Sequence, residues 1–486
     1  MADLITKSQL KGPVLLLRRN RGVAITFEKI KPIAISAICL AVFLACAGLR
    51  LLNGGGIEEV RRFGDTGDYT QKADWPLWSW GQHTGPLRGI MTWWLQGRSP
   101  TVPLFYKMAG NVPRNIVILQ LSFSILSWGL LAVVVSRAIQ FSWLKPFAFL
   151  IILLFSLSDH IIMWDGALLS DSISLSLLAL FIASWLWLLE NWHWRRAALM
   201  LAVAFLWVFS RDTNAWIILM LAALLLLIGR FSRSRRCLLI ASVFVVFFLA
   251  NEVSQSYSHR WVEPFYNIIL QRILPNAEWT ASFARLGMPV TPALMQRSGQ
   301  LAWSQNWSLY SDPAFREFRD WAYHRGKSSY ARFLLEHPVM TTLEPLRNIE
   351  ALIAPKLTAK ASYYWSNSFF PILTGFIAEL IYFQKFALLW VHAAGLLFGV
   401  VFAFALRQQE PKWFIPLTLI MLAYPHLAIV WHGDSNDIGR HALQAGVHFR
   451  IGLWILILFA CDRMLLQTTT PPLVMTSSER RPGYKD

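Results

Sequence analysis

Residues 172–189 read SISLSLLALFIASWLWLL, eighteen residues without a charged side chain. An α-helix of that length extends about 27 Å at 1.5 Å per residue, close to the roughly 30 Å hydrocarbon thickness of a bilayer. This stretch therefore predicts a helix that crosses a membrane. Comparable stretches recur along the chain and decide its fold.

Nine further apolar runs show the same character, at 33–52, 116–136, 146–163, 197–210, 215–229, 237–251, 386–406, 413–431 and 442–460. The composition agrees, since 55% of the 486 residues are hydrophobic and only 15% are charged. A soluble protein of this size is less apolar and carries more charge. We predict an all-α, polytopic membrane protein with about ten transmembrane helices.

The runs 197–210 and 215–229 are short, and the polar residues Ser210–Asn214 lie between them. Non-helical backbone is tolerated at membrane depth only where protein buries it or where it lines a water-filled cavity. We therefore expect a tight turn that lies below the membrane surface.

Basic residues are distributed unevenly between the two sides that these spans define. If the N-terminus is cytoplasmic, the segments on that side hold 21 basic and 7 acidic residues, and the rest of the chain holds 24 and 21. Because cytoplasmic loops carry an excess of Lys and Arg, we predict a cytoplasmic (inner) membrane protein with both termini on the cytoplasmic side. The net charge of +17 is then explained by basic residues that set the orientation of the chain and contact anionic membrane lipid. Nucleic acid is not expected as a partner.

Targeting and cysteine patterns add two expectations. The first apolar run lacks a clear small-residue cleavage site and is expected to stay as a signal anchor. Cys39, Cys46, Cys237 and Cys461 lie in or at the ends of spans, which predicts neither a disulfide scaffold nor a zinc site.

Two outer segments are long enough to carry function. The predicted organisation is a cytoplasmic basic N-terminus (1–32), an N-terminal transmembrane bundle (33–252) that includes a first outer loop (53–114), an extracytoplasmic helical domain (253–375), C-terminal transmembrane helices (376–463) and a cytoplasmic tail (464–486). Tryptophans interleaved with basic residues in the first outer loop predict short interfacial helices, and plain membrane anchoring explains them equally well. Apolar spacing over 314–336 predicts a helix that begins after Ser311-Asp312-Pro313 and ends at His337-Pro338.

Polar residues from four separate turns all fall on the outer side of this topology. They are Asp65 and Asp68; Asp159, His160, Asp165 and Asp171; Arg211 and Asp212; and His432, Asp434, Asp437, Arg440 and His441. Ionisable groups at the mouth of a membrane helix bundle are costly and indicate a functional site. The inner turns carry mainly Lys and Arg, so we expect the chemistry on the outer face.

These groups have complementary chemical capacities. A carboxylate beside a substrate hydroxyl can act as general base, and burial would raise its pKa toward the working range. Arginine and histidine suit a phosphate leaving group, because a guanidinium donates paired, charge-assisted hydrogen bonds. The combination fits the transfer of a sugar from a lipid phosphate.

The stretch Asp65-Thr66-Gly67-Asp68-Tyr69 fits the Asp-x-x-x-Tyr arrangement that the GT-C superfamily of integral membrane glycosyltransferases commonly places in its first outer loop. The chain resembles that superfamily at four further turns: Leu169–Ser172, Ser210–Asn214, Glu336–Pro338 and Asp437–His441. Many relatives have adjacent acids in the first loop, whereas here the two acids are three residues apart. The division of labour between Asp65 and Asp68 therefore stays open.

The resemblance implies a GT-C-like fold and transfer of a sugar from a polyprenyl-phosphate donor to a glycan, lipid or protein acceptor on the extracytoplasmic face, with inversion at the anomeric carbon. The expected site residues are Asp65 and then Asp68 as catalytic base, Arg440, His441 and Arg211 as ligands of the donor phosphate, and Asp171, Asp212, Asp437 and Tyr69 as further candidates.

Structural alternatives exist for these residues. Asp65 could be an exposed carboxylate in a turn, and Asp68 could form an ion pair with Arg61 or Arg62. Asp171 could cap the N-terminus of a helix, and Arg211 and Asp212 could pair with each other. Arg440 could bind lipid headgroups. The acids offer enough oxygen ligands for a divalent cation, without a fixed geometry. Two other functions stay open: a polysaccharide polymerase or ligase with a diphosphate-linked donor, and a lipid or sugar transporter or flippase.

Overall fold

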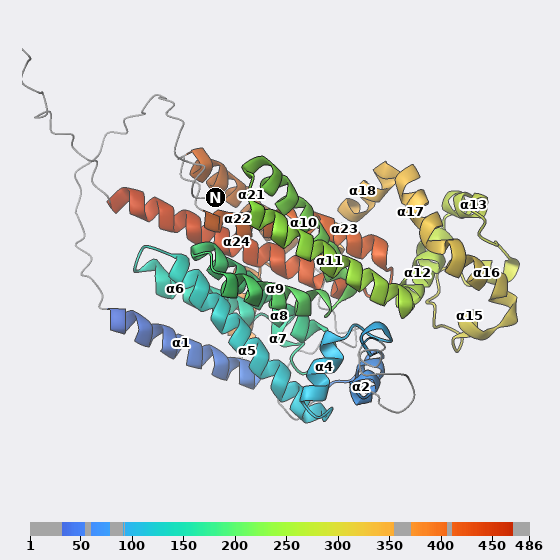
Figure 1. The fold of residues 1–486 in the computed structure, drawn as a ribbon, viewed down its shortest axis with the longest axis horizontal. Helices are drawn as coiled ribbons and strands as arrows, with labels where there is room; N and C mark the ends of the chain where they lie inside the picture. Colours follow the sequence, from blue (N-terminus) through green and yellow to red (C-terminus); the bar gives the residue numbers. More distant parts are fainter. Residues whose placement is uncertain are drawn as a thin grey trace, which may run out of the picture.

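In the computed structural model, the chain forms an elongated bundle of helices with a smaller helical domain at one end (Figure 1). The structure describes residues 32–53, 60–77, 91, 93–353, 371–405 and 411–469. None of these residues forms a β-strand, which confirms the predicted all-α class. Of the predicted N-terminal segment (1–32) only Pro32 is described, and of the predicted C-terminal tail (464–486) residues 464–469 are described, as the last turns of α24.

Each predicted span coincides with helical residues. The bundle helices are α1 (Pro32–Asn53), α5 (Pro113–Ala138), α6 (Leu144–Ser156), α8 (Asp171–Glu190), α9 (Trp194–Val208), α10 (Asp212–Ser232), α11 (Arg235–Tyr257), α21 (Phe386–Ala405), η6 (Pro411–Trp413), α22 (Phe414–Met421), α23 (Ala423–Gly433) and α24 (Ile438–Thr469). Within the described part of the chain, six helical stretches are long and apolar enough to cross a membrane. The chain is therefore a multi-pass membrane protein.

The ends of several spans differ from the prediction. Helix α6 ends at Ser156 rather than near residue 163, and a buried connection that contains α7 (Asp159–Ile162) follows it. The predicted span 413–431 is divided at Leu422 into α22 and α23. Pro425 explains this division, because it has no N–H to donate to the carbonyl of Met421.

A buried ion pair fixes the connection after α6. Arg50, in the last turn of α1, donates from Nε to Asp165 at 2.8 Å and from Nη1 to the carbonyl of Ser156 at 3.0 Å. Asp165 also accepts a hydrogen bond from Ser172 Oγ at 2.7 Å. The polar connection is thus held by protein, as irregular backbone within a membrane requires.

The first outer loop contains the short helices α2 (Thr66–Asp74) and α4 (Thr101–Met108). Residues 54–59, 78–90 and 92 of this loop lie outside the described residues. Trp93 is buried and donates to the carbonyl of Lys72 at 3.3 Å, and Trp94 stacks on Phe205 at 5.3 Å between ring centroids. These two tryptophans thus pack against protein.

The outer domain consists of α12 (Val262–Ile268), η2 (Ile269–Ile273), α13 (Ala277–Arg285), α14 (Pro292–Met295), α15 (Ser308–Ser311), η3 (Pro313–Phe315), α16 (Arg316–Trp321), η4 (Ala322–Gly326) and α17 (Lys327–Glu336). These elements share an aromatic core that includes Phe265, Phe283 and Phe333. The helix predicted over 314–336 is present, with a π-helical turn in its middle. Asp312 begins it by accepting a hydrogen bond from the backbone N–H of Ala314 at 2.8 Å.

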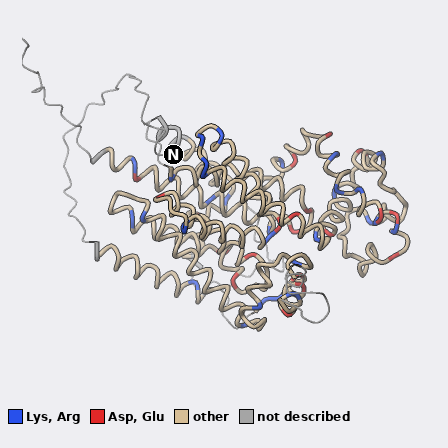
Figure 2. The backbone as a smooth tube through the Cα atoms, in the orientation of Figure 1, with Lys and Arg blue, Asp and Glu red and all other residues tan. Residues whose placement is uncertain are grey.

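The chain then returns along the bundle through α18 (Pro338–Arg347) and α19 (Ile349–Ile353), followed by α20 (Pro371–Phe376) and η5 (Ile377–Ile381). Helix α18 packs against α23 and α19 packs against α24. The outer segment thus rejoins the bundle by Ile353, before the predicted domain boundary at residue 375. Acidic residues gather toward the end of the bundle near the outer domain, whereas the opposite end carries mainly Lys and Arg (Figure 2).

Candidate functional site

Backbone contacts attach the first outer loop to the connection between α6 and α8. The N–H of Arg61 donates to the carbonyl of Gly166, and the N–H of Leu168 donates to the carbonyl of Arg61, each at 2.9 Å, which forms an isolated parallel bridge. Thr66 Oγ1 donates to the carbonyl of Leu168 at 2.9 Å. These contacts bring the start of α2, with Asp65, beside the start of α8, with Asp171.

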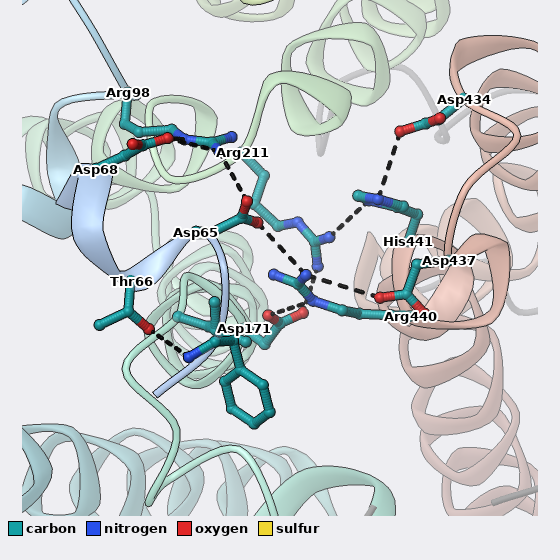
Figure 3. Close-up of polar contacts among 12 residues, drawn as sticks. Asp65, Thr66, Asp68, Arg98, Asp171, Arg211, Asp434, Asp437, Arg440 and His441 are labelled. Atoms are coloured by element: carbon teal, nitrogen blue, oxygen red, sulfur yellow. Dashed lines mark hydrogen bonds and ion pairs between the residues drawn. The ribbon is translucent and has the colours of Figure 1, made fainter. Parts of the chain in front are cut away.

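Asp171 is the centre of a buried network of charges (Figure 3). Its carboxylate accepts a hydrogen bond from Arg211 Nη1 at 2.7 Å and another from Arg440 Nε at 3.1 Å. The three residues come from the starts of α8, α10 and α24. One carboxylate therefore joins three helices that are distant in the sequence.

The network continues from Arg440 to the first outer loop. Arg440 Nη1 lies 3.5 Å from Asp65 Oδ2 and 3.8 Å from Asp437 Oδ2. The other oxygen of Asp65 accepts a hydrogen bond from Arg98 Nη2 at 2.8 Å, and Arg98 Nε donates to Asp68 at 2.9 Å. Asp65 thus lies between two guanidinium groups.

The side chain of Arg98 packs against the ring of Tyr69. The phenol ring is buried, and the guanidinium of Arg98 lies 5.6 Å from the ring centroid, a cation–π distance. Tyr69 also packs edge-on against Tyr106, with 6.2 Å between ring centroids. The Asp-x-x-x-Tyr spacing therefore places an acid and an aromatic support on one arginine.

His441 extends the network toward the loop between α23 and α24. Its Nδ1 lies 3.1 Å from Arg211 Nη2, and because arginine only donates, Nδ1 is the acceptor and Nε2 carries the proton of the neutral ring. Nε2 lies 3.8 Å from Asp434 Oδ2. Burial raises the pKa of Asp434 to about 6, although backbone N–H groups of Asn436 and Ser435 oppose the rise.

A cavity of about 430 Å³ opens beside these charges. Its polar wall includes Asp65, Arg98, Arg211, Asp212, Arg260, Asp434, Arg440 and His441. Its apolar wall includes Trp216, Phe265, Ile268, Leu334, Ile429 and Val430. The volume is within the range of small-molecule sites, and the cavity offers both a charged and an apolar surface to one ligand.

The expected rise in the pKa of Asp65 is wrong. Burial does act in that direction, but the positive charges of Arg98 and Arg440 outweigh it and hold the pKa of this carboxyl below its ordinary value. Asp65 is therefore ionised at neutral pH. A change that draws either arginine away would make it a stronger base.

The structural alternatives considered for Asp68, Arg211 and Asp212 are not found. Asp68 binds Arg98 rather than Arg61 or Arg62. Arg211 and Asp212 do not pair with each other, since the extended backbone at Arg211 turns its side chain to Asp171 and Asp212 forms a two-pronged pair with Arg260 at 2.9 and 3.0 Å. Arg440 and His441 lie within the first turn of α24 rather than before the helix.

The alternative role of Asp171 as a helix N-cap is not found. Ser170 occupies the N-cap position of α8 without a side-chain capping bond, and Asp171 is the first helical residue. The positive end of the helix dipole still favours a carboxylate there. The turn at Ser210–Arg211 is buried, as the sequence predicts.

Some of the polar residues that the sequence placed on the outer face do not join this network. Asp165 pairs with Arg50, and the buried ring of His160 stacks on Tyr382 at 4.2 Å between centroids. Conversely, the sequence indicated only an interfacial role for Arg98 and no role for Arg260. The position of Arg98 in a polar turn just before Pro100 could have indicated a role in the site. Nothing in the sequence distinguishes Arg260 from other arginines.

No group of three or more His, Cys, Asp or Glu side chains that could hold a metal ion occurs among the described residues. Arginines lie between the carboxylates of the network, so the acids do not converge on one point. Comparisons of the chain with protein-family models and with curated proteins find no match.

Replacing Asp171 with alanine leaves Arg211 and Arg440 buried without their shared carboxylate. We expect Asp171→Ala to lower the free energy of unfolding by about 3–5 kcal/mol, the usual cost of breaking a buried ion pair. The matched control is Asp68→Ala, which removes a 58% exposed carboxylate and should cost no more than about 1 kcal/mol. Denaturant unfolding in detergent micelles measures both; equal losses would contradict a central role for Asp171.

Proposed function

We propose that the protein is a membrane glycosyltransferase of the GT-C type, which moves a sugar from a polyprenyl-phosphate donor to an acceptor on the extracytoplasmic face. The observation that carries the proposal is the position of Asp65 at 2.8 Å from Arg98 and 3.5 Å from Arg440, on the wall of a cavity with one charged and one apolar side. A sugar joined to a lipid phosphate has the same division into a polar head and an apolar tail.

The residues suit an inverting displacement. Asp65 takes the proton of the acceptor hydroxyl as that oxygen forms its bond to the anomeric carbon, and the bond from the anomeric carbon to the phosphate oxygen breaks. The electron pair leaves with the phosphate, whose developing charge Arg440, Arg211 and His441 stabilise. The proton remains on Asp65 until it is lost to water.

The arginines would connect donor binding to basicity. A phosphate that binds Arg440 supplies a competing negative charge and weakens the attraction between Arg440 and Asp65. Because that attraction holds down the pKa of Asp65, donor binding would raise the pKa and make the carboxylate a better base. The base would thus gain strength only when the donor is in place.

The proposal includes the finer membrane arrangement that the sequence predicts. About ten transmembrane helices cross a cytoplasmic membrane, both termini are cytoplasmic, and the charged network faces outward. The distribution of charge along the bundle supports this orientation, since the end opposite the network carries mainly Lys and Arg (Figure 2).

A transporter or flippase is the second candidate. The division of one span into α22 and α23 favours it, because transporters build their binding sites from discontinuous helices. Against it, the charged groups of the site gather at one end of the bundle. Transfer of a labelled sugar to an acceptor, rather than movement of an intact lipid across the bilayer, distinguishes the two functions.

In proteoliposomes supplied with a polyprenyl-phosphate sugar, Asp65→Asn should lower kcat for sugar transfer at least 100-fold, because it removes the general base. Asp68→Asn should lower it less than tenfold, since Asp68 is more exposed and contacts only Arg98 among the site residues. Asp320→Asn, in the outer domain, is the matched control. Unchanged transfer by Asp65→Asn would refute its role as base, and no transfer by the wild type from any lipid-linked sugar would refute the enzyme proposal.

Arg98→Gln tests the electrostatic control of Asp65. Losing this positive charge should raise the pKa of Asp65. The base must be ionised, so kcat/KM falls as pH drops through that pKa, and the fall should begin at a higher pH in the variant than in the wild type. A pH profile of transfer measures the shift, and Arg316→Gln on exposed α16 should leave it unchanged; identical profiles for Arg98→Gln and wild type would contradict the coupling.

A further inference from the structure

The end of α17 and helix α18 carry a stripe of aliphatic side chains that are partly or largely exposed. Leu335, at the end of α17, is 80% exposed, and Val339 in α18 is 69% exposed. Leu343 and Leu346 continue the stripe at helical spacing and are also exposed. Exposed aliphatic side chains that follow one another along a helix in this way mark a surface suited to contact with a partner or a membrane.

The opposite side of α18 is attached to the bundle. His432 Nε2 donates to the carbonyl of Thr341 at 2.8 Å, and the hydroxyl of Tyr424 donates to the carbonyl of Thr342. Both partners belong to α23, and Figure 1 shows α18 at the junction between the bundle and the outer domain. The exposed stripe therefore cannot be the face that α18 uses to fold onto its own chain.

The next helix reaches deeper along the bundle. The terminal carbonyl of α19, at Ile353, accepts a hydrogen bond from Arg450 Nη2 at 2.5 Å. Arg450 is twelve residues beyond Ile438, the start of α24, which corresponds to about 18 Å along the helix axis. Because α17 belongs to the outer domain and α19 ends at that depth, α18 must pass the level at which the bundle enters the membrane.

We propose that α18 lies in the membrane interface, with Leu335, Val339, Leu343 and Leu346 inserted into the lipid leaflet on the site's side of the bilayer. This position gives the stripe an apolar environment, as the bilayer would also give the exposed aliphatic side chains of the spanning helices, such as Leu249 and Val253 of α11. The arrangement is that of an interfacial amphipathic helix.

The flanks of the stripe are polar and carry paired charges. Arg332 forms an ion pair with Glu336 at 2.6 Å, Arg347 forms one with Glu344 at 3.1 Å, and both guanidinium groups are exposed, so these pairs would lie in the headgroup layer when the aliphatic side chains are inserted. The contact also has a consequence for the cavity, because Tyr330, Ala331 and Leu334 of the adjoining α17 line its wall. Lipid contact at α18 would therefore hold this wall against the bilayer.

Spin labels test the position of α18 directly. Val339→Cys and Leu343→Cys are introduced into a background whose four native cysteines are replaced by alanine, and the labelled protein is reconstituted in vesicles of neutral and anionic phospholipid. Both labels should be accessible to oxygen and shielded from a water-soluble nickel complex. The matched controls are Leu227→Cys, an exposed site on spanning α10, and Glu317→Cys, an exposed site on α16 of the outer domain.

Each outcome decides the proposal. Accessibilities that match Leu227→Cys support insertion in lipid. Accessibilities that match Glu317→Cys would place α18 in water and overturn it. Low accessibility to both reagents would show that protein covers the stripe, either another part of this chain, a second copy or another partner, and would also overturn it.

Discussion

The buried carboxylate of Asp171, shared by Arg211 and Arg440, is the interaction on which the rest of the site depends. It links α8, α10 and α24 at one level of the bundle and sets the direction of both guanidinium groups. Buried ion pairs are weak contributors to stability, since apolar side chains of equal volume often serve as well. Their presence in an apolar bundle therefore points to a use for the charges themselves.

Positive and negative side chains alternate along the network, and this arrangement suggests how the charges are used. Arg98, Asp65, Arg440 and Asp171 form a continuous series, with Arg211 and His441 next to it. Each arginine is already satisfied by carboxylates, so an anionic ligand must compete for them. Under the proposed function, this competition frees Asp65 at the moment its proton affinity is needed, and it keeps the carboxylate unreactive when no donor is bound.

The sequence predicted the fold class and the composition of the site better than its contacts. Apolar runs of membrane-spanning length give the helices directly, and topology alone placed Asp65, Asp171, Arg211 and Arg440 at one end of the bundle. The pairing could not be predicted, because neighbours in sequence such as Arg211 and Asp212 face different partners once the backbone at Arg211 is extended. Opposing effects of burial and charge also decide the pKa of Asp65, and only three-dimensional distances show that charge prevails.

The sequence did not predict that α18 and α19 pack along the bundle, for a similar reason. Polar residues such as Glu344 and Asn348 resemble those of a water-exposed domain, and the contact between Ile353 and Arg450 joins residues 97 positions apart. Hydropathy reports the environment of a segment only when that environment is uniform. The buried polar connection after α6 and the helices that join the outer domain to the bundle combine polar and apolar surroundings, and there the prediction and the structure differ most.

A structure of the protein in lipid nanodiscs with a bound polyprenyl monophosphate would test the proposed role of the network. We predict that the phosphate oxygens lie within hydrogen-bond distance of Arg440 and of Arg211 or His441, and that Asp65 is farther from Arg440 than the 3.5 Å found here. A phosphate bound away from this network, with the Asp65, Arg440 and Asp171 contacts unchanged, would contradict it.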